Sequence, residues 1–179
     1  MILGPTHLLE LVSKIQLVTN LSERELTNPE GAGFDLRLGE VYTIAGNAFL
    51  GVTERHTAQV TLIGKYDEKK ASSITLKPGD FVLTKTIEDM NMPEYLTASI
   101  TPRSTTYRSG LVLRTGNVPP GYCGGLTFGL HNAGPVEVTI ELGSRFVHIQ
   151  FSEVAGGGNM YRGQWQGGRV TTTEKEVQV

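Results

Sequence analysis

The feature that most constrains the fold is a succession of short apolar segments between residues 33 and 154. The first, GFDLRLGEVYTI, alternates Phe34, Leu36 and Leu38 with polar or small residues, the period-two pattern of a β-strand. Turn signals such as KPGD and PPG separate several of these segments. The later segments, rich in β-branched residues, are AQVTLIG, SSITLK, DFVLTKTIE, LTASITP, GLVLRTG, GGLTFGLHN, VEVTIEL and RFVHIQFSEV. The pattern predicts an all-β, mainly antiparallel sandwich or barrel, of jelly-roll type.

The N-terminal region is predicted to be helical instead. Leu8, Val12 and Ile15 recur at helical spacing, and Pro5 stands where a first helical turn tolerates proline. We therefore expect a short helix over about residues 6–16. Ser22 followed by Glu25 has the pattern of a capping box for a second, shorter helical turn.

The C-terminal segment, residues 156–179, contains consecutive glycines and no apolar periodicity. A frayed terminus is one interpretation. However, the segment retains Tyr161 and Trp165, and aromatic residues are depleted from segments that bury nothing. We predict a β domain over residues 1–155, followed by a Gly-hinged arm over residues 156–179 that closes over a bound molecule.

Composition limits the partners of such a domain. The net charge is −2 and the pI is about 6.1, so there is no basic surface typical of binding to nucleic acid or to an acidic membrane. A single cysteine, Cys123, excludes an intrachain disulfide and is typical of a reducing cytosol. The N-terminus lacks the features of a signal peptide, and no stretch reaches the roughly 18 apolar residues of a membrane span. We expect a soluble cytoplasmic protein with no nucleic-acid or membrane partner.

Arginines and hydroxyls crowd together in PRSTTYRSG, residues 102–110. Guanidinium forks match phosphate oxygens, and hydroxyls with free turn amides complete an anion site. Arg103, Ser104, Thr105 and Arg108 are therefore candidate phosphate ligands. The alternative is an ordinary solvated polar turn.

Two further candidates are less specific. In the hairpin NVPPGYCGGL, glycines such as Gly121 let the backbone approach a flat ligand and Tyr122 could stack on a sugar or base, although a core role for Tyr122 fits equally well. Asp35 follows Gly-Ala-Gly on the first strand, where an inward carboxylate needs an arginine or a metal-bound water, and an outward one needs nothing. The four histidines lack metal-ligand spacing and fit structural roles.

Taken in order, several segments resemble the motifs of the dUTPase and dCTP deaminase superfamily, in particular its deaminase-like and archaeal dUTPase-like branch. The segments that carry the resemblance are AGFDL (32–36), PRSTTYRSGL (102–111), GNVPPGYCGGLTFGLHN (116–132), GSRFVHIQF (143–151) and YRGQWQGGRVTT (161–172).

The resemblance implies a homotrimer of β-sandwich or jelly-roll subunits with active sites shared between subunits. It also implies a deoxynucleoside triphosphate ligand, dUTP or dCTP, with Mg2+ bound through the phosphates. Ser104, Thr105 and the two arginines would hold the phosphate chain, and Tyr122 would pack under the deoxyribose. Asn117, Gly121 and Asn132 would shape the nucleoside pocket, and Tyr161 and Gln166 of the arm would close over it.

The sequence departs from the family at both catalytic acids. The acid that orients water in dUTPases, three positions before the aromatic residue of the hairpin, corresponds to Pro119. The glutamate that shuttles protons in dCTP deaminases corresponds to Gly129. Asp35, or Glu40 of a neighbouring subunit, is the candidate replacement. Family glutamine and lysine positions correspond to His148, Gln164 and Gly168.

We therefore expect hydrolysis of dUTP to dUMP and pyrophosphate. The alternatives are deamination of dCTP, a catalytically impaired homologue that binds deoxynucleotides as a sensor, and a scaffold without a nucleotide. The sequence assigns no role to residues 46–73.

Overall fold

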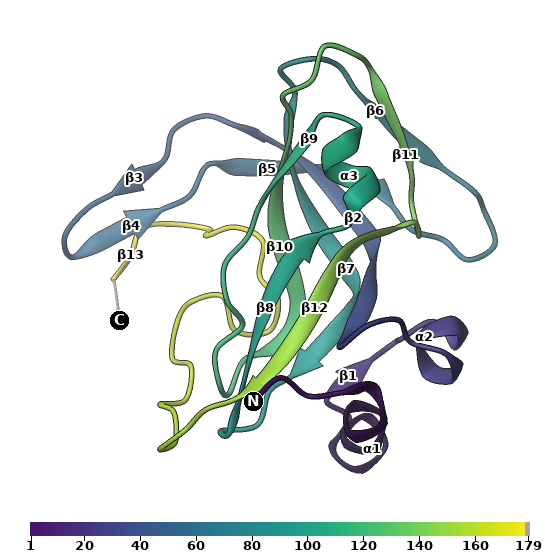
Figure 1. The fold of residues 1–179 in the computed structure, drawn as a ribbon. Coiled ribbons are helices and arrows are strands. Elements are labelled where there is room, and N and C mark those ends of the chain that lie inside the picture. Colours follow the sequence, from purple (N-terminus) through teal and green to yellow (C-terminus); the bar gives the residue numbers. More distant parts are fainter. Residues whose placement is uncertain (178–179) are drawn as a thin grey trace.

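The computed structural model describes residues 1–177 and consists mainly of antiparallel strands (Figure 1). The helices are α1 (Pro5–Ile15), α2 (Glu23–Thr27) and α3 (Ser104–Arg108). The strands are β1 (Val18–Thr19), β2 (Phe34–Ala45), β3 (Phe49–Leu50), β4 (Glu54–His56), β5 (Gln59–Lys65), β6 (Ser73–Leu76), β7 (Phe81–Asn91), β8 (Leu96–Pro102), β9 (Leu111–Arg114), β10 (Cys123–Asn132), β11 (Val138–Glu141), β12 (Arg145–Glu153) and β13 (Glu176–Val177).

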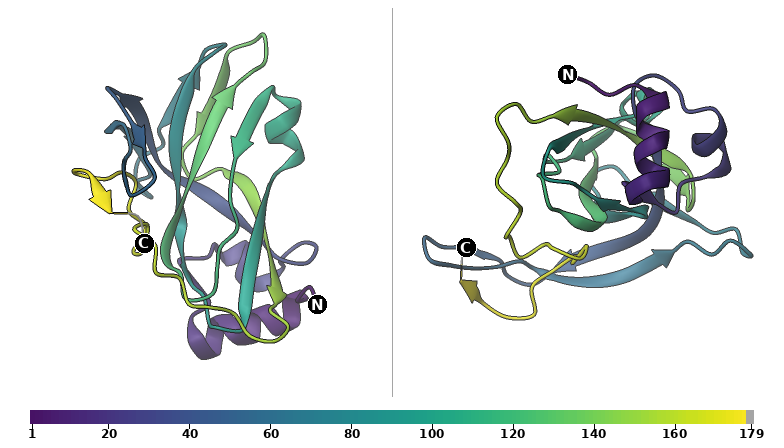
Figure 2. Two further views of the ribbon diagram at one scale, coloured as in Figure 1. Left: turned by 90° about the vertical axis from the view of Figure 1, so that its left-hand side faces the viewer. Right: turned by 90° about the horizontal axis from the view of Figure 1, so that it is seen from below.

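Within residues 1–177 the main sheet has eight strands, in the order β8-β12-β2-β7-β10-β9, with β1 on β7 and β5 on β2. The sheet curls into a nearly closed barrel, which Figure 2 shows from below in its right-hand view. The predicted segments coincide with β2 and with β5 to β12, so the all-β prediction is confirmed. The very short strands β1, β3 and β13 went unpredicted because strands of two residues show no period.

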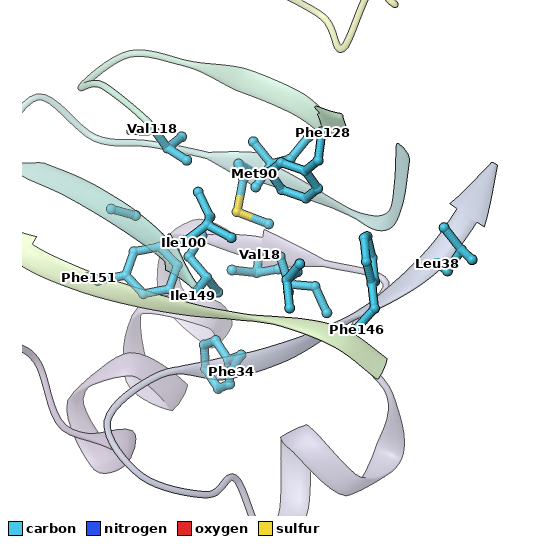
Figure 3. Packing of buried hydrophobic residues seen from close by; sticks show 14 of the residues in the cluster. Val18, Phe34, Leu38, Met90, Ile100, Val118, Phe128, Phe146, Ile149 and Phe151 are labelled. Carbon is cyan, nitrogen blue, oxygen red and sulfur yellow. The ribbon is translucent and has the colours of Figure 1, made fainter. Parts of the chain in front are cut away.

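The core lies inside the barrel and follows the predicted alternation. Phe34, Leu36 and Leu38 of β2 are fully buried. Phe34 meets the ring of Phe151 of β12 edge to face, with 6.3 Å between the ring centroids (Figure 3). Burial of such side chains is the main force that closes the sheet.

The helices α1 and α2 lie at one end of the barrel and α3 at the other (Figure 1). α1 begins at Pro5, ends at Ile15 and buries Leu8 and Leu11, which confirms the predicted helix. Figure 2 shows it across the barrel opening. The backbone amide of Glu25 donates to Ser22 Oγ over 3.5 Å, so the predicted cap of α2 is also confirmed. None of the helices within residues 1–177 is long and apolar enough to cross a membrane.

Two segments lie outside the barrel. β3 and β4 form a hairpin beside it, and the segment after β12 returns along the barrel until β13 pairs with β4 (Figure 1). Residues far apart in sequence, near 55 and near 176, therefore become neighbours.

Candidate functional site

The first part of the site is a cluster of charged side chains around Asp35, which we call the charged cluster: Arg24, Glu25, Asp35, Arg103, Arg145 and His148. The side chain of Asp35 is only 5% exposed. Its carboxylate pairs with the guanidinium of Arg103 and accepts a hydrogen bond from Arg145 Nη1 over 3.0 Å. His148 Nδ1 lies 3.0 Å from its other oxygen. Asp35 is therefore buried on the face of β2 opposite to Phe34 and Leu36, and it holds arginine partners.

The helix α2 contributes Arg24 and Glu25 to the charged cluster. The carboxylate of Glu25 is fully buried and accepts a hydrogen bond from the backbone amide of Asp35 over 3.0 Å. Arg24 pairs with Glu25 and reaches Asp35 at 3.8 Å. The cluster is thus tied to the cap of α2, and its buried acids are balanced by arginines.

Burial lowers the pKa of His148, and nearby Arg103 adds to this effect, whereas Glu25 and Glu30 oppose it. Asp35 alone would raise that pKa, but its charge is shared with Arg103 and Arg145. A neutral His148 that donates Nδ1–H to Asp35 satisfies both groups. Burial, together with Arg145 and Arg24, also lowers the pKa of Arg103.

The helix α3 presents the predicted phosphate ligands. Arg103 occupies the N-cap position without a side-chain capping bond. Ser104, Thr105 and Arg108 are exposed on the single helical turn. Thr106 turns inward, and its hydroxyl donates to the backbone oxygen of Phe146 over 3.0 Å. The structure brings the four predicted ligands together beside the charged cluster, and their role in binding phosphate stays a prediction.

The second part of the site is a cavity of about 700 Å³, which we call the hairpin cavity. It opens because β9 stays beside β10 only as far as Arg114, after which the chain diverges and Val118 bridges Ala98 of β8. Residues 116–128 form one wall, residues 48–58 of the β3–β4 hairpin another, and residues 161–170 a third. Within residues 1–177, no aspartate or glutamate lines it.

Arm residues 156–177 lie against the hairpin of their own chain. The amide of Tyr161 donates to Pro120 O over 2.7 Å, and that of Gly167 donates to Cys123 O over 2.8 Å. Gln166 donates through Nε2 to Gly121 O over 2.9 Å and accepts from the Cys123 amide over 3.1 Å. Gln166 thus binds the hairpin backbone through both its amide nitrogen and its amide oxygen. Whether the arm hinges and closes over a ligand stays a prediction, and residues 178–179 of the predicted arm lie outside the described part.

The predicted nucleoside ligands are divided between two places. Asn117 and Tyr122 line the hairpin cavity, next to the turn that holds Gly121. Tyr122 is buried, donates to Gly125 O over 2.7 Å and packs edge to face on Tyr161. Burial raises the pKa of Tyr122 to about 12, so its hydroxyl stays protonated.

Asn132 lies elsewhere and has structural partners. It is fully buried, and its Nδ2 donates to the backbone oxygens of Leu76 and Val136, each over 2.8 Å. Its Oδ1 accepts from the amide of Gly134 over 3.1 Å. These bonds fasten the turn after β10. The described residues that line the hairpin cavity do not include Asn132, and its role at a nucleoside stays a prediction.

The two positions that lack the family acids differ in their surroundings. Pro119 lines the hairpin cavity. Gly129 is crowded instead: a Cβ there would lie 2.8 Å from Phe81 Cζ and 3.2 Å from Arg114 Cβ. An acidic side chain at residue 129 would therefore require the Phe81 ring to move.

The sequence did not single out two residues of the hairpin cavity, Arg55 and His56 of β4. Their segment lacks a local motif, and they reach the cavity only because β4 pairs with both β3 and the distant β13. A pattern of nearby residues could not reveal this proximity.

Strand β8 separates the two parts of the site. Val118, at the hairpin cavity, bridges Ala98, whereas Arg103 follows the end of the strand. Ile100 of β8 lines the cavity, and at a rise of about 3.3 Å per residue it lies about 10 Å from Arg103. The four predicted phosphate ligands are not among the described residues lining the hairpin cavity.

The described side chains do not by themselves form a metal site. Within residues 1–177, no three histidine, cysteine, aspartate or glutamate side chains gather so that they could hold a metal ion. The carboxylates of Asp35 and Glu25 bind arginines instead. These residues fit a Mg2+ ion only if most of its ligands come from a bound nucleotide.

Comparison with known proteins gives a consistent result. A family model described as dCTP deaminase-like matches residues 2–154. A dCTP deaminase of Thermococcus kodakarensis is 32% identical over 166 residues, which cover 92% of this chain and 94% of that protein. A dUMP-forming dCTP deaminase of Dictyoglomus thermophilum is 29% identical over 160 residues, which cover 87% and 81%.

Among solved structures, a 2'-deoxycytidine 5'-triphosphate deaminase from Agrobacterium tumefaciens has a similar fold, with a TM-score of 0.66 at 18% identity. The match covers 86% of this chain and 49% of that one, so this chain spans about half the length of that protein.

Proposed function

The chain belongs to the dCTP deaminase-like family, and from this premise we propose that it binds a deoxypyrimidine nucleoside triphosphate and hydrolyses dUTP to dUMP and pyrophosphate. The observation that favours hydrolysis over deamination is the absence of acid from the base side of the site. Within residues 1–177 the hairpin cavity has no acidic lining residue, and Phe81 fills the space beside Gly129. The family resemblance assigns the proton transfer of deamination to a glutamate, and no lining residue within 1–177 supplies that carboxylate.

The complete site is proposed to lie between copies of the chain. The exposed residues of α3 do not line the hairpin cavity, and along β8 they begin about 10 Å beyond its lining residue Ile100, so we infer that another copy brings phosphate ligands to a nucleotide in the cavity. A homotrimer, which the family resemblance implies, would place the α3 of one copy beside the hairpin of another. This assembly is part of the proposal.

Each group of residues has a separate task in this mechanism. Arg103 and Arg108 bind and orient the phosphates, and Asp35 positions Arg103 through their ion pair. Tyr122 and the arm exclude water from the nucleoside side. Mg2+, held by the phosphates, would offset their charge. Water attacks the α-phosphorus and the bond to the bridging oxygen of the β-phosphate breaks, which yields dUMP and pyrophosphate, while the proton lost by the water passes to solvent.

A second candidate is a nucleotide-binding protein that does not turn its ligand over. It is favoured by Pro119, which cannot accept a proton, and by the arginine partners that occupy Asp35. A general base contributes roughly two to four orders of magnitude in rate, so its loss is severe.

A product assay separates these candidates. The purified protein is incubated with Mg2+ and either dUTP, dCTP or dTTP, and both pyrophosphate and base identity are followed. We expect pyrophosphate and dUMP from dUTP, with kcat/KM reduced about tenfold by Arg108→Gln, which removes an exposed guanidinium. Uracil formed from dCTP would contradict the proposal.

Stabilisation without turnover would support the second candidate instead. A nucleotide at 100 times its Kd stabilises the folded state by about 2.7 kcal/mol, which a melting experiment detects. If no deoxynucleotide stabilises the protein, both candidates are wrong.

A further inference from the structure

The hairpin cavity has an unbalanced set of charges. Its charged lining residues are Arg55 and Arg169, with His56 beside them, and none of the lining residues within 1–177 is acidic. Arg169 is already engaged, because it pairs with Glu176 over 2.5 Å and donates to Gln164 O over 3.2 Å. Arg55 has no such partner in residues 1–177, and its Nε is buried without a hydrogen bond.

Two neighbours of Arg55 share this lack of partners. His56 Nδ1 and Thr127 Oγ1 are buried without a hydrogen bond in the described structure, and both residues line the same cavity. Buried polar groups are paired in more than nine cases of ten, so three unpaired groups at one cavity are unusual. A ligand that brings hydrogen-bonding atoms would satisfy them.

The shape of this wall suits a flat ligand. The ring of Phe49 stacks on His56, with centroids 6.3 Å apart and an angle of 27° between the planes. Tyr122 and Trp165 line other sides of the cavity. The cavity is therefore bounded by aromatic rings and has its donors on the β3–β4 hairpin.

We propose that Arg55 is a specificity-determining residue. Its guanidinium donates to the C4 carbonyl oxygen of a pyrimidine in the hairpin cavity and thereby selects uracil over cytosine. The inference rests on the proposed function, because it assumes that a deoxypyrimidine nucleotide occupies this site. Uracil has a carbonyl at C4, whereas cytosine has an amino group there. A guanidinium has donors only, so it pairs with the carbonyl and leaves an amino group unpaired.

The base carbonyl is preferred to a phosphate oxygen as the partner of Arg55. The candidate phosphate ligands gather on α3, beyond the far end of β8, whereas Arg55 shares its cavity with Tyr122 and Phe128. Both sources supply oxygen acceptors, so the experiment has to distinguish them.

The test is equilibrium binding of non-hydrolysable imido analogues of dUTP and dCTP, and of inorganic tripolyphosphate, in the presence of Mg2+. The wild type is compared with Arg55→Met, which keeps the stem and removes the donors, and with Arg55→Lys, which keeps a donor. Arg114→Met is the matched control, because Arg114 at the end of β9 is exposed and does not line the cavity. Melting curves verify that each variant is folded.

We expect the wild type to bind the dUTP analogue on the order of tenfold more tightly than the dCTP analogue, as one hydrogen bond to a charged group allows. Arg55→Met should reduce this ratio to within about threefold by weakening the dUTP analogue alone. Arg55→Lys should retain part of the preference, and Arg114→Met all of it.

Three outcomes would overturn the inference. Equal weakening of both analogues and of tripolyphosphate in Arg55→Met would make Arg55 a phosphate ligand. A wild-type preference for the dCTP analogue would contradict the selection of uracil and leave nucleotide binding intact. If neither analogue binds the wild type, the proposed function is overturned as well.

Discussion

The charged cluster and the hairpin cavity treat their buried polar groups in opposite ways. In the charged cluster, Asp35 and Glu25 are almost fully buried, and each has arginine partners from the same chain. In the hairpin cavity, the lining is largely apolar and the buried polar atoms of Arg55, His56 and Thr127 lack partners within residues 1–177.

The difference separates a structural use of polar groups from a binding use. A buried charge costs so much free energy that folding proceeds only when a partner is at hand, and the cluster meets this demand internally. An unpaired buried donor costs about 1–3 kcal/mol, which the protein tolerates where a ligand recovers that energy. We therefore expect mutations in the charged cluster to act mainly on folding, and those in the cavity mainly on binding.

The largest effect that this contrast predicts follows from Asp35→Asn. The substitution keeps the shape and leaves Arg103 and Arg145 without their counter-charge, so the free energy of unfolding should fall by roughly 3 kcal/mol. Urea denaturation measures the change. The control is Glu10→Gln, which removes an equal charge from an exposed pair with Lys14 on α1 and should leave the midpoint nearly unchanged.

An unchanged midpoint in Asp35→Asn would erase the contrast. It would mean that the carboxylate is not needed for folding and that Asp35 is free for the catalytic role predicted from the sequence. A stable variant that has lost hydrolysis would support that role directly.

The fold was predictable from the sequence because its main signals are local. The alternation in β2, the turns around KPGD and PPG, and the cap at Ser22 are all properties of neighbouring residues. The family resemblance is carried by the order of the motifs along the chain, and it is confirmed by the matching family model and relatives. The sequence left open whether Asp35 is buried. An alternating strand has two faces, and distant segments of the chain decide whether the second face is covered.

The hairpin cavity could not be predicted, because its walls come from three distant segments. Arg55 reaches it through the pairing of β4 with β13, and Trp165 through the hydrogen bonds of the arm to the hairpin. The tight turn at Gly121 was recognised, but the space behind it depends on where β9 leaves β10. Such proximity is a property of tertiary packing.

A medium effect is predicted where the arm meets the hairpin. Gly124 has a φ of 113°, and a Cβ there would lie 2.5 Å from both Gly167 C and Gly168 N. Gly124→Ala should therefore detach the arm locally at a cost of about 1–3 kcal/mol. Trp165 is the single tryptophan and packs beside this contact, so its fluorescence should shift to longer wavelength.

The matched control is Gly116→Ala, which also lies at the cavity but has nothing within 4 Å of its Cβ position. Its tryptophan emission should equal that of the wild type. If Gly124→Ala also keeps the wild-type emission, the arm is not held by this close approach, and the third wall of the hairpin cavity has another origin.

The smallest predicted effect is on the pH dependence of stability, and it concerns His148 of the charged cluster. Because burial and Arg103 lower the pKa of His148 in the folded state, the unfolded chain takes up a proton first, near pH 6.5, as the pH falls. The stabilisation is therefore fully present above pH 6.5 and is lost as the pH falls from there through the folded pKa. His148→Gln removes this loss and should flatten the stability profile between about pH 7 and pH 5 by less than about 1 kcal/mol. Urea titrations at several pH values measure it. If wild-type stability instead rose on acidification, Asp35 would outweigh burial, and His148 would be a charged partner in the cluster rather than a neutral donor.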